Sequence, residues 1–377
     1  MTELNLVLDA ITEVIMERRK TEAGGGGGGA AASAGGGTEG SAYDAPTATE
    51  YFAALMTALE ANQHVPQLLS LLARIMPEVP SAVLRATFGG LAKSLQRFAK
   101  MAATAEGEQG QAALRSVLSC IGTVLAAQAT ASATWERPET LRLFHALLAF
   151  ITDARPKVRR AAQEGVAAVL RVHRAARFAG LAVHVASFVR KVLEGCTVGD
   201  CTRTLQLLVL LRDVLPLLPL PALRDLAPSL VALLRLGHPM LAAHALSAIG
   251  CIVRPSRTDD PDSDVDAALV GTLLQGVLSA PPGLGDLEAA STVCTTLPVA
   301  LERLRGQGDG ERKDTTKLLA RHYKSTIAIN VTLTSLIGVT SPWTSPWTLR
   351  WSKRRPCCWR AIETSLPIGA PKSLSRN

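Results

Sequence analysis

Residues 153–170 read DARPKVRRAAQEGVAAVL. Within this stretch the cations are Arg155, Lys157, Arg159 and Arg160. The same letters place Val158, Ala162, Gly165 and Val169 at helical spacing on one stripe. The stretch therefore allows two interpretations: a cationic surface for nucleic acid, or a helix that packs its inward stripe on a neighbouring helix.

The composition favours helices. Of the 377 residues, 47% are apolar but only 4% are aromatic, so the core must be built from Ala, Leu and Val. Ala and Leu have the highest helix propensities, and sequence patterns typical of strands are scarce before residue 325. We therefore expect an all-α protein, arranged as two ordinary domains or as one elongated repeat array.

The net charge of +8 belongs to the end of the chain. Of the 40 Lys and Arg and the 32 Asp and Glu, residues 306–377 hold 12 and 4, which leaves 28 of each in residues 1–305. A local excess remains in residues 153–191, where nine Lys and Arg face only Asp153 and Glu164. Any interaction with nucleic acid in the body of the chain is therefore expected to be local.

The compartment is predicted from the cysteines and from the apolar segments. Seven cysteines are scattered without the even spacing of a disulfide framework. The N-terminus lacks the uninterrupted apolar core of a secretory signal. The most apolar run, 205–234, is broken by charges and prolines. We expect a reducing intracellular compartment and no membrane partner.

Changes of composition divide the chain into four segments. We predict a short amphipathic helix over 1–23, a Gly-rich flexible linker over 24–46, a HEAT-like solenoid over 47–305 and an irregular, basic, Trp-containing tail over 306–377. Within the solenoid the expected helices are 48–62, 65–76, 81–103, 110–130, 138–152, 156–174, 177–195, 199–215, 221–236, 239–253, 264–279 and 286–304.

The spacing of these helices indicates a repeat. Helices that begin near 156, 199 and 239 each follow a partner that begins near 138, 177 and 221. A helical hairpin repeated about every 40 residues is typical of an α-solenoid of the HEAT type. Each hairpin leaves an apolar face uncovered, so neighbouring hairpins must stack to bury it.

The stretch at 153–170 fits the turn of a HEAT hairpin. Asp153 would accept N–H groups at the start of the second helix, and Pro156 would begin that helix. Val158 would face the partner helix, and Arg159 would point along the stack to a neighbouring Asp or carbonyl. We assign these four residues a structural role.

The tail differs abruptly from the body. Four of the five Trp lie between residues 343 and 359, and TIAINVTLTSLIGVT (326–340) is Thr-rich without helical period. Our hypothesis is that this tail comes from a retained intron or a shifted reading frame.

No catalytic or metal-binding motif is present in the sequence. It lacks a phosphate-binding GxxxxGK[ST] loop, a HExxH helix, a GxSxG elbow and paired CxxC motifs. Cys196 and Cys201 have no second pair, and His238 and His244 are placed on different helix faces. The acidic segment 259–266 lacks the Gly and the closing Glu of a calcium loop. We expect no enzyme, no cofactor and no small-molecule substrate.

The remaining candidates are binding surfaces. Lys157, Arg160 and Arg171 share the outward face of the helix 156–174 with Glu164, and this row is either solvated or a basic ridge for RNA phosphates or an acidic partner. Further cations that follow it are Arg174, Arg177, Arg190 and Lys191. Because no aromatic residues interleave with the cations, RNA contact would be made with the backbone.

Several stretches resemble a known family. PKVRRAAQEGVAAVL (156–170), TRTLQLLVLLRDVLPLLP (202–219) and LLRLGHPMLAAHALSAI (233–249) resemble ribosomal RNA-processing protein twelve, a nucleolar HEAT-repeat family of ribosome assembly factors. ATEYFAALMTALE (48–60) is similar to the start of its amino-terminal region. The residues that match its motifs are Pro156, Lys157, Val158, Arg159, Ala161, Ala162, Gln163, Gly165, Leu205, Leu211, Asp213, Leu215 and Pro216.

The resemblance implies a non-enzymatic scaffold in ribosomal RNA processing and in subunit maturation and export. Its partners would be pre-ribosomal proteins and the RNA backbone, in the nucleus and more specifically the nucleolus. Because family members are longer, the resemblance also implies a truncated amino-terminal portion. Two alternatives stay open: a transport-receptor-like solenoid for cargo or a small GTPase, and a cytoplasmic protein–protein adaptor.

Overall fold

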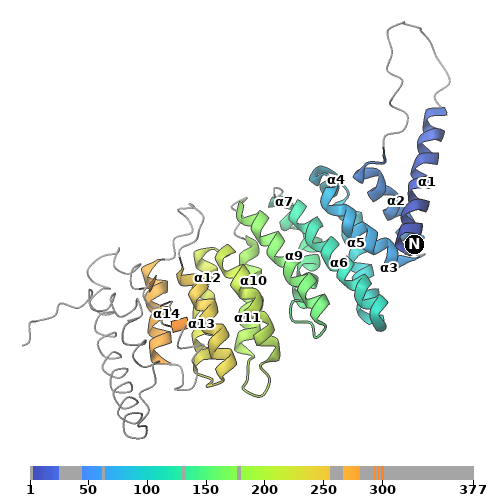
Figure 1. Cartoon of the computed structure of the whole chain (residues 1–377). Helices are drawn as coiled ribbons and strands as arrows, with labels where there is room; N and C mark the ends of the chain where they lie inside the picture. Colours follow the sequence, from blue (N-terminus) through green and yellow to red (C-terminus); the bar gives the residue numbers. More distant parts are fainter. Residues whose placement is uncertain are drawn as a thin grey trace, which may run out of the picture. The chain divides into compact units, whose positions relative to one another are not determined.

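The structure of the chain is a computed structural model that describes most of the residues before position 281. The described residues are 3–24, 45–61, 64–129, 132–175, 180–254 and 266–280, with positions 292, 293, 296, 299 and 300. No strand occurs among them, which confirms the all-α class (Figure 1). The chain divides into two compact units, residues 1–181 and 182–377. The expected linker, the last expected helix and the tail lie largely or wholly outside the described residues.

The helices of the first unit are α1 (Glu3–Gly24), α2 (Ala48–Glu60), α3 (Val65–Ile75), α4 (Ser81–Ala86), α5 (Phe88–Thr104), α6 (Gly107–Ala127), α7 (Ser132–Trp135), α8 (Pro138–Ala149) and α9 (Pro156–Ala175). From the unit boundary onward follow α10 (Gly180–Glu194), α11 (Thr202–Val214), α12 (Leu220–Leu234), α13 (Pro239–Val253) and α14 (Ala267–Ser279). Short 3₁₀ turns, η1 (Met76–Glu78) and η2 (Leu215–Leu217), follow α3 and α11.

Prolines set the start of several helices, as the sequence predicts. Pro138, Pro156 and Pro239 are the first residues of α8, α9 and α13. Proline suits this position because the missing N–H would have no partner within the helix and the ring fixes a helical φ. These starts keep the helical-hairpin spacing along the chain.

Two predicted boundaries are wrong. The expected helix 81–103 is divided at Thr87, whose backbone (φ −91°, ψ 1°) leaves helical geometry between α4 and α5. The helix expected from 110 begins at Gly107, which adopts φ +84°. Only glycine takes this left-handed conformation at little cost, so Gly107 both ends the loop and opens α6.

The first unit stacks three helical hairpins. They pair α2 with α3, α5 with α6, and α8 with α9. The second helices pack in the order α3, α6 and α9, while the first helices α5 and α8 lie side by side. We call these two sets the second-helix layer and the first-helix layer. Their apolar faces meet between the layers, as stacked hairpins require.

The middle helix of the second-helix layer is the most buried element of the first unit. Leu114, Val117, Leu118, Ile121 and Leu125 of α6 are fully buried. By length and composition α6 is also the one described helix apolar enough to cross a membrane. Since α3, α5 and α9 all pack against it, its apolar character is explained by its place in the core.

Two glycines bring α6 and α9 into close contact. A Cβ added to Gly122 of α6 would lie 2.8 Å from the Cα of Gly165 of α9. A Cβ on Gly165 would meet Leu147 of α8 at 3.3 Å. A side chain at position 122 therefore does not fit between the two backbones, which explains Gly165 in the stretch at 153–170 as a packing residue.

The second unit repeats the same plan. α11 packs against α13, and α12 packs against both α13 and α14. Its core is leucine-rich, with Leu207, Leu211, Leu226, Leu230 and Leu241 fully buried. A glycine again allows a close approach, because a Cβ on Gly276 of α14 would overlap the side chain of Val231 of α12.

The glycine contact predicts an unusual pair of substitutions. Gly122→Ala gains about 1 kcal/mol of helix propensity but overpacks the α6–α9 contact at a cost of about 1–3 kcal/mol. We expect a net loss of stability of up to about 2 kcal/mol. Gly90→Ala on α5, where nothing lies within 4 Å of an added Cβ, should instead stabilise by about 0.5–1 kcal/mol. Urea unfolding followed by helicity measures both, and two effects of the same sign would contradict the packing argument.

Candidate RNA and partner interface

The turn before α9 is closed by an ion pair. The Asp153 carboxylate accepts hydrogen bonds from the Arg155 backbone N–H at 2.8 Å and from Nε and Nη2 of Arg155 at 2.9 Å. These hydrogen bonds, led by the Arg155 side chain, lower the pKa of Asp153. The sequence predicts that Asp153 accepts hydrogen bonds from N–H groups at the start of α9. In the structure it accepts one backbone N–H, that of Arg155, and its other two hydrogen bonds come from the Arg155 guanidinium.

Arg159 differs from its prediction. Its Nη1 donates to the carbonyl oxygens of Asp153 at 2.7 Å and Ala154 at 3.4 Å, both in its own turn. It therefore braces the hairpin to which it belongs, and the prediction that it points along the stack is wrong. The reason is geometric: the chain reverses before Pro156, which leaves these carbonyls without helical partners and within reach of position 159.

The inward face of α9 is apolar, as predicted. Val158, Ala162, Val166 and Val169 are fully buried. The amide of Gln163 donates to the Ile151 carbonyl at 3.0 Å, a second tie between α9 and the loop before it. The position and packing of α9 are therefore set by the turn and the buried stripe, which leaves the outward face available for binding.

The outward face of α9 carries Lys157, Arg160 and Arg171, which we call the α9 row. All three are exposed. Arg160 pairs with Glu164 at 2.9 Å, but both side chains are so exposed that the pair contributes little. Lys157 and Arg171 make no ion pair with any residue that the structure describes. The row therefore offers three solvated cations along one side of the helix.

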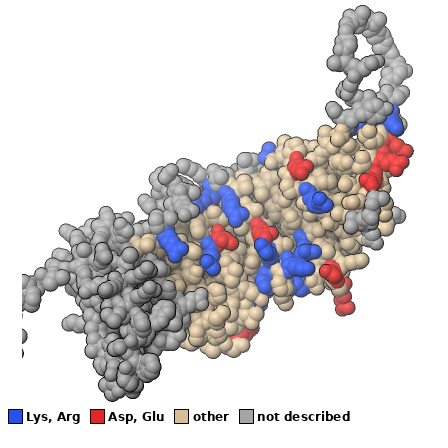
Figure 2. Space-filling view, viewed as in Figure 1, with Lys and Arg blue, Asp and Glu red and all other residues tan. Residues whose placement is uncertain are grey.

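The other predicted cations differ from the α9 row in their surroundings or lie outside the first unit. Arg174 is half-buried and already engaged, and Arg177 lies outside the described residues. In the second unit, Arg190 pairs with Asp225 at 2.5 Å and with Glu194 at 3.8 Å, while Lys191 is exposed. On the face shown in Figure 2, cations and acids are interspersed over uncharged surface. Binding through charge must therefore depend on local rows.

A second cationic row was missed from the sequence. Lys93, Arg97 and Lys100, which we call the α5 stripe, are all exposed on one side of α5. They follow the spacing i, i+4 and i+7, and this spacing could have revealed them. They were overlooked because the stretch at 153–191 has the higher density of charge.

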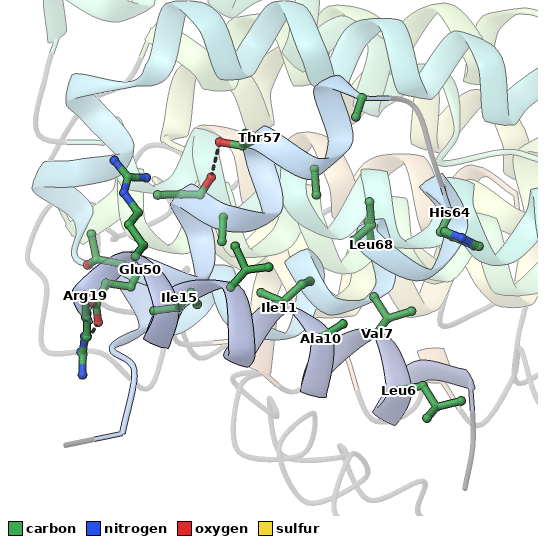
Figure 3. A pocket seen from close by; sticks show the side chains of 17 residues that line it. Leu6, Val7, Ala10, Ile11, Ile15, Arg19, Glu50, Thr57, His64 and Leu68 are labelled. Carbon is green, nitrogen blue, oxygen red and sulfur yellow. Dashed lines mark hydrogen bonds and ion pairs between the residues drawn. The ribbon is translucent and has the colours of Figure 1, made fainter. Parts of the chain in front are cut away.

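The docking of the N-terminal helix was also not anticipated. α1 buries Ile11 and Ile15 against α2 and α3 (Figure 3). A hydrogen bond between the hydroxyl groups of Thr12 and Tyr51, at 2.9 Å, joins α1 to α2. Arg19 forms a two-pronged ion pair with Glu50, at 2.8 and 2.6 Å. The Arg19 hydrogen bonds lower the pKa of Glu50 to about 2. No local pattern in the sequence links residues so far apart.

Beside this contact, α1, α2 and α3 line a groove of about 840 Å³. Its lining includes Val7 and Val14 of α1, Ala54 and Ala58 of α2, and Leu68 of α3. Small side chains on α2 leave this space open. The groove therefore lies on the side of the α2–α3 hairpin against which α1 packs.

The buried aromatic cluster of the first unit contains a histidine. The ring of His173 on α9 lies 4.4 Å from that of Trp135 in an edge-to-face arrangement. Trp135 also packs against Phe144 and donates from Nε1 to the Gln128 carbonyl at 3.2 Å. Burial lowers the pKa of His173 to about 4. His173 is therefore a neutral core residue at neutral pH.

Among the described residues, no group of three or more His, Cys, Asp or Glu side chains could hold a metal ion. Cys201 Sγ and His238 Nε2 lie 3.7 Å apart, between the starts of α11 and α13. A pair of this kind lacks the further ligands that a structural zinc requires.

The described chain stacks helical hairpins, begins α8, α9 and α13 with proline and closes the turn before α9 with an Asp–Arg ion pair. These features are typical of a HEAT-repeat protein. Residues 43–260, more than half of the chain, match the family model for RRP12-like, N-terminal HEAT repeats. The chain therefore belongs to the RRP12-like family.

Known relatives agree with this assignment. The chain is 34% identical to an RRP12-like protein of Gallus gallus over 262 residues, which are 67% of this chain and 20% of the relative. It is 33% identical to an RRP12-like protein of Homo sapiens over 211 residues, 54% of this chain and 16% of the relative. A Drosophila melanogaster RRP12-like protein is 30% identical over 173 residues, 45% of this chain and 10% of the relative. The chain spans a fifth or less of the length of these relatives.

The buried histidine predicts a loss of stability in mild acid. The folded pKa of His173, about 4, lies below its ordinary value of 6.5, so between these values the unfolded chain binds more protons. Stability is therefore complete above pH 6.5 and falls as the pH approaches 4, by about 2 kcal/mol at pH 5. His173→Leu should remove most of this decline. Urea unfolding at pH 7.5 and pH 5 measures it, and equal pH dependence in both proteins would refute the assignment.

Proposed function

We propose that this chain is a non-enzymatic HEAT-repeat scaffold of ribosome biogenesis, which takes part in ribosomal RNA processing and in the maturation and export of pre-ribosomal subunits. Membership of the RRP12-like family supports this role. The proposed setting is the nucleus, and more specifically the nucleolus. The proposed partners are proteins of the pre-ribosomal particle and the backbone of its RNA.

The observation that carries the RNA part of the proposal is the α9 row. Its members lie on the exposed side of a helix whose opposite side is fully buried, so the cations are held at fixed positions. Lys157 and Arg171 are 14 residues apart, which spans about 21 Å along the helix axis. That length allows contact with several successive phosphates of one RNA strand.

The chemistry of α9 favours the RNA backbone over the bases. The helix carries no Phe, Tyr or Trp on which a base could stack. Arg and Lys bind phosphate by charge and by hydrogen bonds, without regard to sequence. Binding should therefore be salt-sensitive and weakly selective, and other proteins of the particle would supply the specificity.

A charge-reversal variant tests this interface. Lys157→Glu, Arg160→Glu and Arg171→Glu together should weaken binding of a single-stranded RNA of about 20 nucleotides by about tenfold or more at moderate salt, and should reduce the slope of affinity against salt. Filter binding across a salt series measures both. Because the three residues are exposed, helicity should be unchanged.

The matched control reverses the α5 stripe, which changes the net charge by the same amount. If the control loses as much RNA affinity as the α9 variant, binding reflects overall charge and the α9 row is not an interface. If the α9 variant binds RNA like the wild type, the row is only solvated.

Purification of the tagged chain from cells tests the wider role: it should recover pre-ribosomal RNA with subunit proteins. Nucleotide-dependent recovery of a small GTPase would instead support a transport receptor, and recovery of neither would support a cytoplasmic adaptor.

A further inference from the structure

We infer that the α5 stripe is a docking surface for an acidic amphipathic helix of a partner protein. Lys93, Arg97 and Lys100 lie on one side of α5 and span about 10 Å along its axis. The other side of the helix is held in the core by Leu91, Leu95 and Phe98. The stripe is therefore a rigid, straight row of cations.

The stripe differs from several other cationic positions on the described helices. Arg19, Arg160, Arg190 and Arg224 have acidic partners, which are Glu50, Glu164, Asp225 and Asp266. The three cations of the α5 stripe make no ion pair with any residue that the structure describes. α5 itself contains no Asp or Glu.

The absence of acidic partners for these three cations destabilises α5. Lys93 and Arg97 are four residues apart, and Arg97 and Lys100 are three apart. Like charges at these spacings repel one another and destabilise a helix. A helix face that only needs to be solvated is served as well by alternating charges, as on α9 and α10. An uncompensated row is favourable once a partner supplies the opposite charge.

The surroundings of the stripe indicate which partner fits. Met101 is half exposed beside Lys100, and Gly89 and Gly90 at the start of the helix have open space around them. The guanidinium of Arg97 lies 4.8 Å from the centroid of the Phe98 ring, which restrains its position. A helix with carboxylates at i, i+4 and i+7 and an apolar residue beside them complements this surface.

RNA fits the stripe less well. Phe88 and Phe98, the only aromatic residues of α5, are buried and cannot stack on bases. An exposed methionine has no complement in a sugar–phosphate backbone, whereas it packs readily on an apolar helix face. The α5 stripe also belongs to the first-helix layer, while the α9 row belongs to the second-helix layer of the same unit. The two rows therefore serve different partners.

The test uses the full chain and a designed probe. The probe is a fluorescent helical peptide of about 20 residues with Glu at i, i+4, i+7 and i+11 on one face and Leu beside them. A control peptide has the same composition with Glu distributed around the helix. Fluorescence anisotropy should show binding of the probe with a Kd below about 100 μM and binding of the control peptide at least fivefold weaker. Probe binding above that limit, or equal binding of the two peptides, overturns the proposal.

Substitutions then locate the binding site. Lys93→Glu, Arg97→Glu and Lys100→Glu together should weaken probe binding about tenfold or more and leave RNA binding unchanged. The α9 row variant should show the reverse, with loss of RNA and retention of the probe. Loss of RNA binding in the α5 variant would make the stripe an RNA surface and overturn the proposal, as would equal loss of probe binding in both variants.

A neutral variant excludes a purely structural explanation. Lys93→Gln, Arg97→Gln and Lys100→Gln together relieve the repulsion along α5, so the melting temperature should stay the same or rise while probe affinity falls. A fall in melting temperature together with lost binding would show that the cations support the fold, and would refute a docking role.

Discussion

The contact between α6 and α9 determines how the first unit is built. The two helices approach so closely at Gly122 and Gly165 that one backbone takes the place of a side chain. This contact fixes α9 against the core helix, and the remaining buried residues of α9, such as Val158 and Ala162, complete the seam. The orientation of every outward side chain on α9 follows from it. The α9 row is therefore exposed as a consequence of packing.

The same constraint separates structural charges from charges that are available for binding. Asp153, Arg155 and Arg159 close the turn before α9 among themselves and with its carbonyls. Of the cations in this stretch, Lys157 and Arg160 remain at the surface, and Arg160 is weakly held by Glu164. Local density of positive charge thus overstates the binding capacity of the stretch. The α5 stripe is the opposite case: it has fewer cations, but none of them pairs with an acidic residue that the structure describes.

Periodic features of the fold could be predicted from the sequence, because each depends on neighbours along the chain. Helix starts at Pro156 and Pro239 and the buried stripe of α9 depend on spacing within one helix. Two other features depend on single backbone conformations. The break at Thr87 was not predicted, and the start of α6 at Gly107 was predicted three residues too late. The α9 row was identified, whereas the engagement of Arg190 by Asp225 was not, since that partner is 35 residues away.

Contacts between distant segments also explain why the N-terminal helix was treated as a separate element. Its pattern indicates only that one face is apolar, and any apolar surface would satisfy it. Arg19 is matched to Glu50, which also closes the capping box of α2 with Thr47, so one carboxylate joins the start of the first hairpin to α1. Because this carboxylate is shared, α1 covers the exposed face of the first hairpin in a defined position.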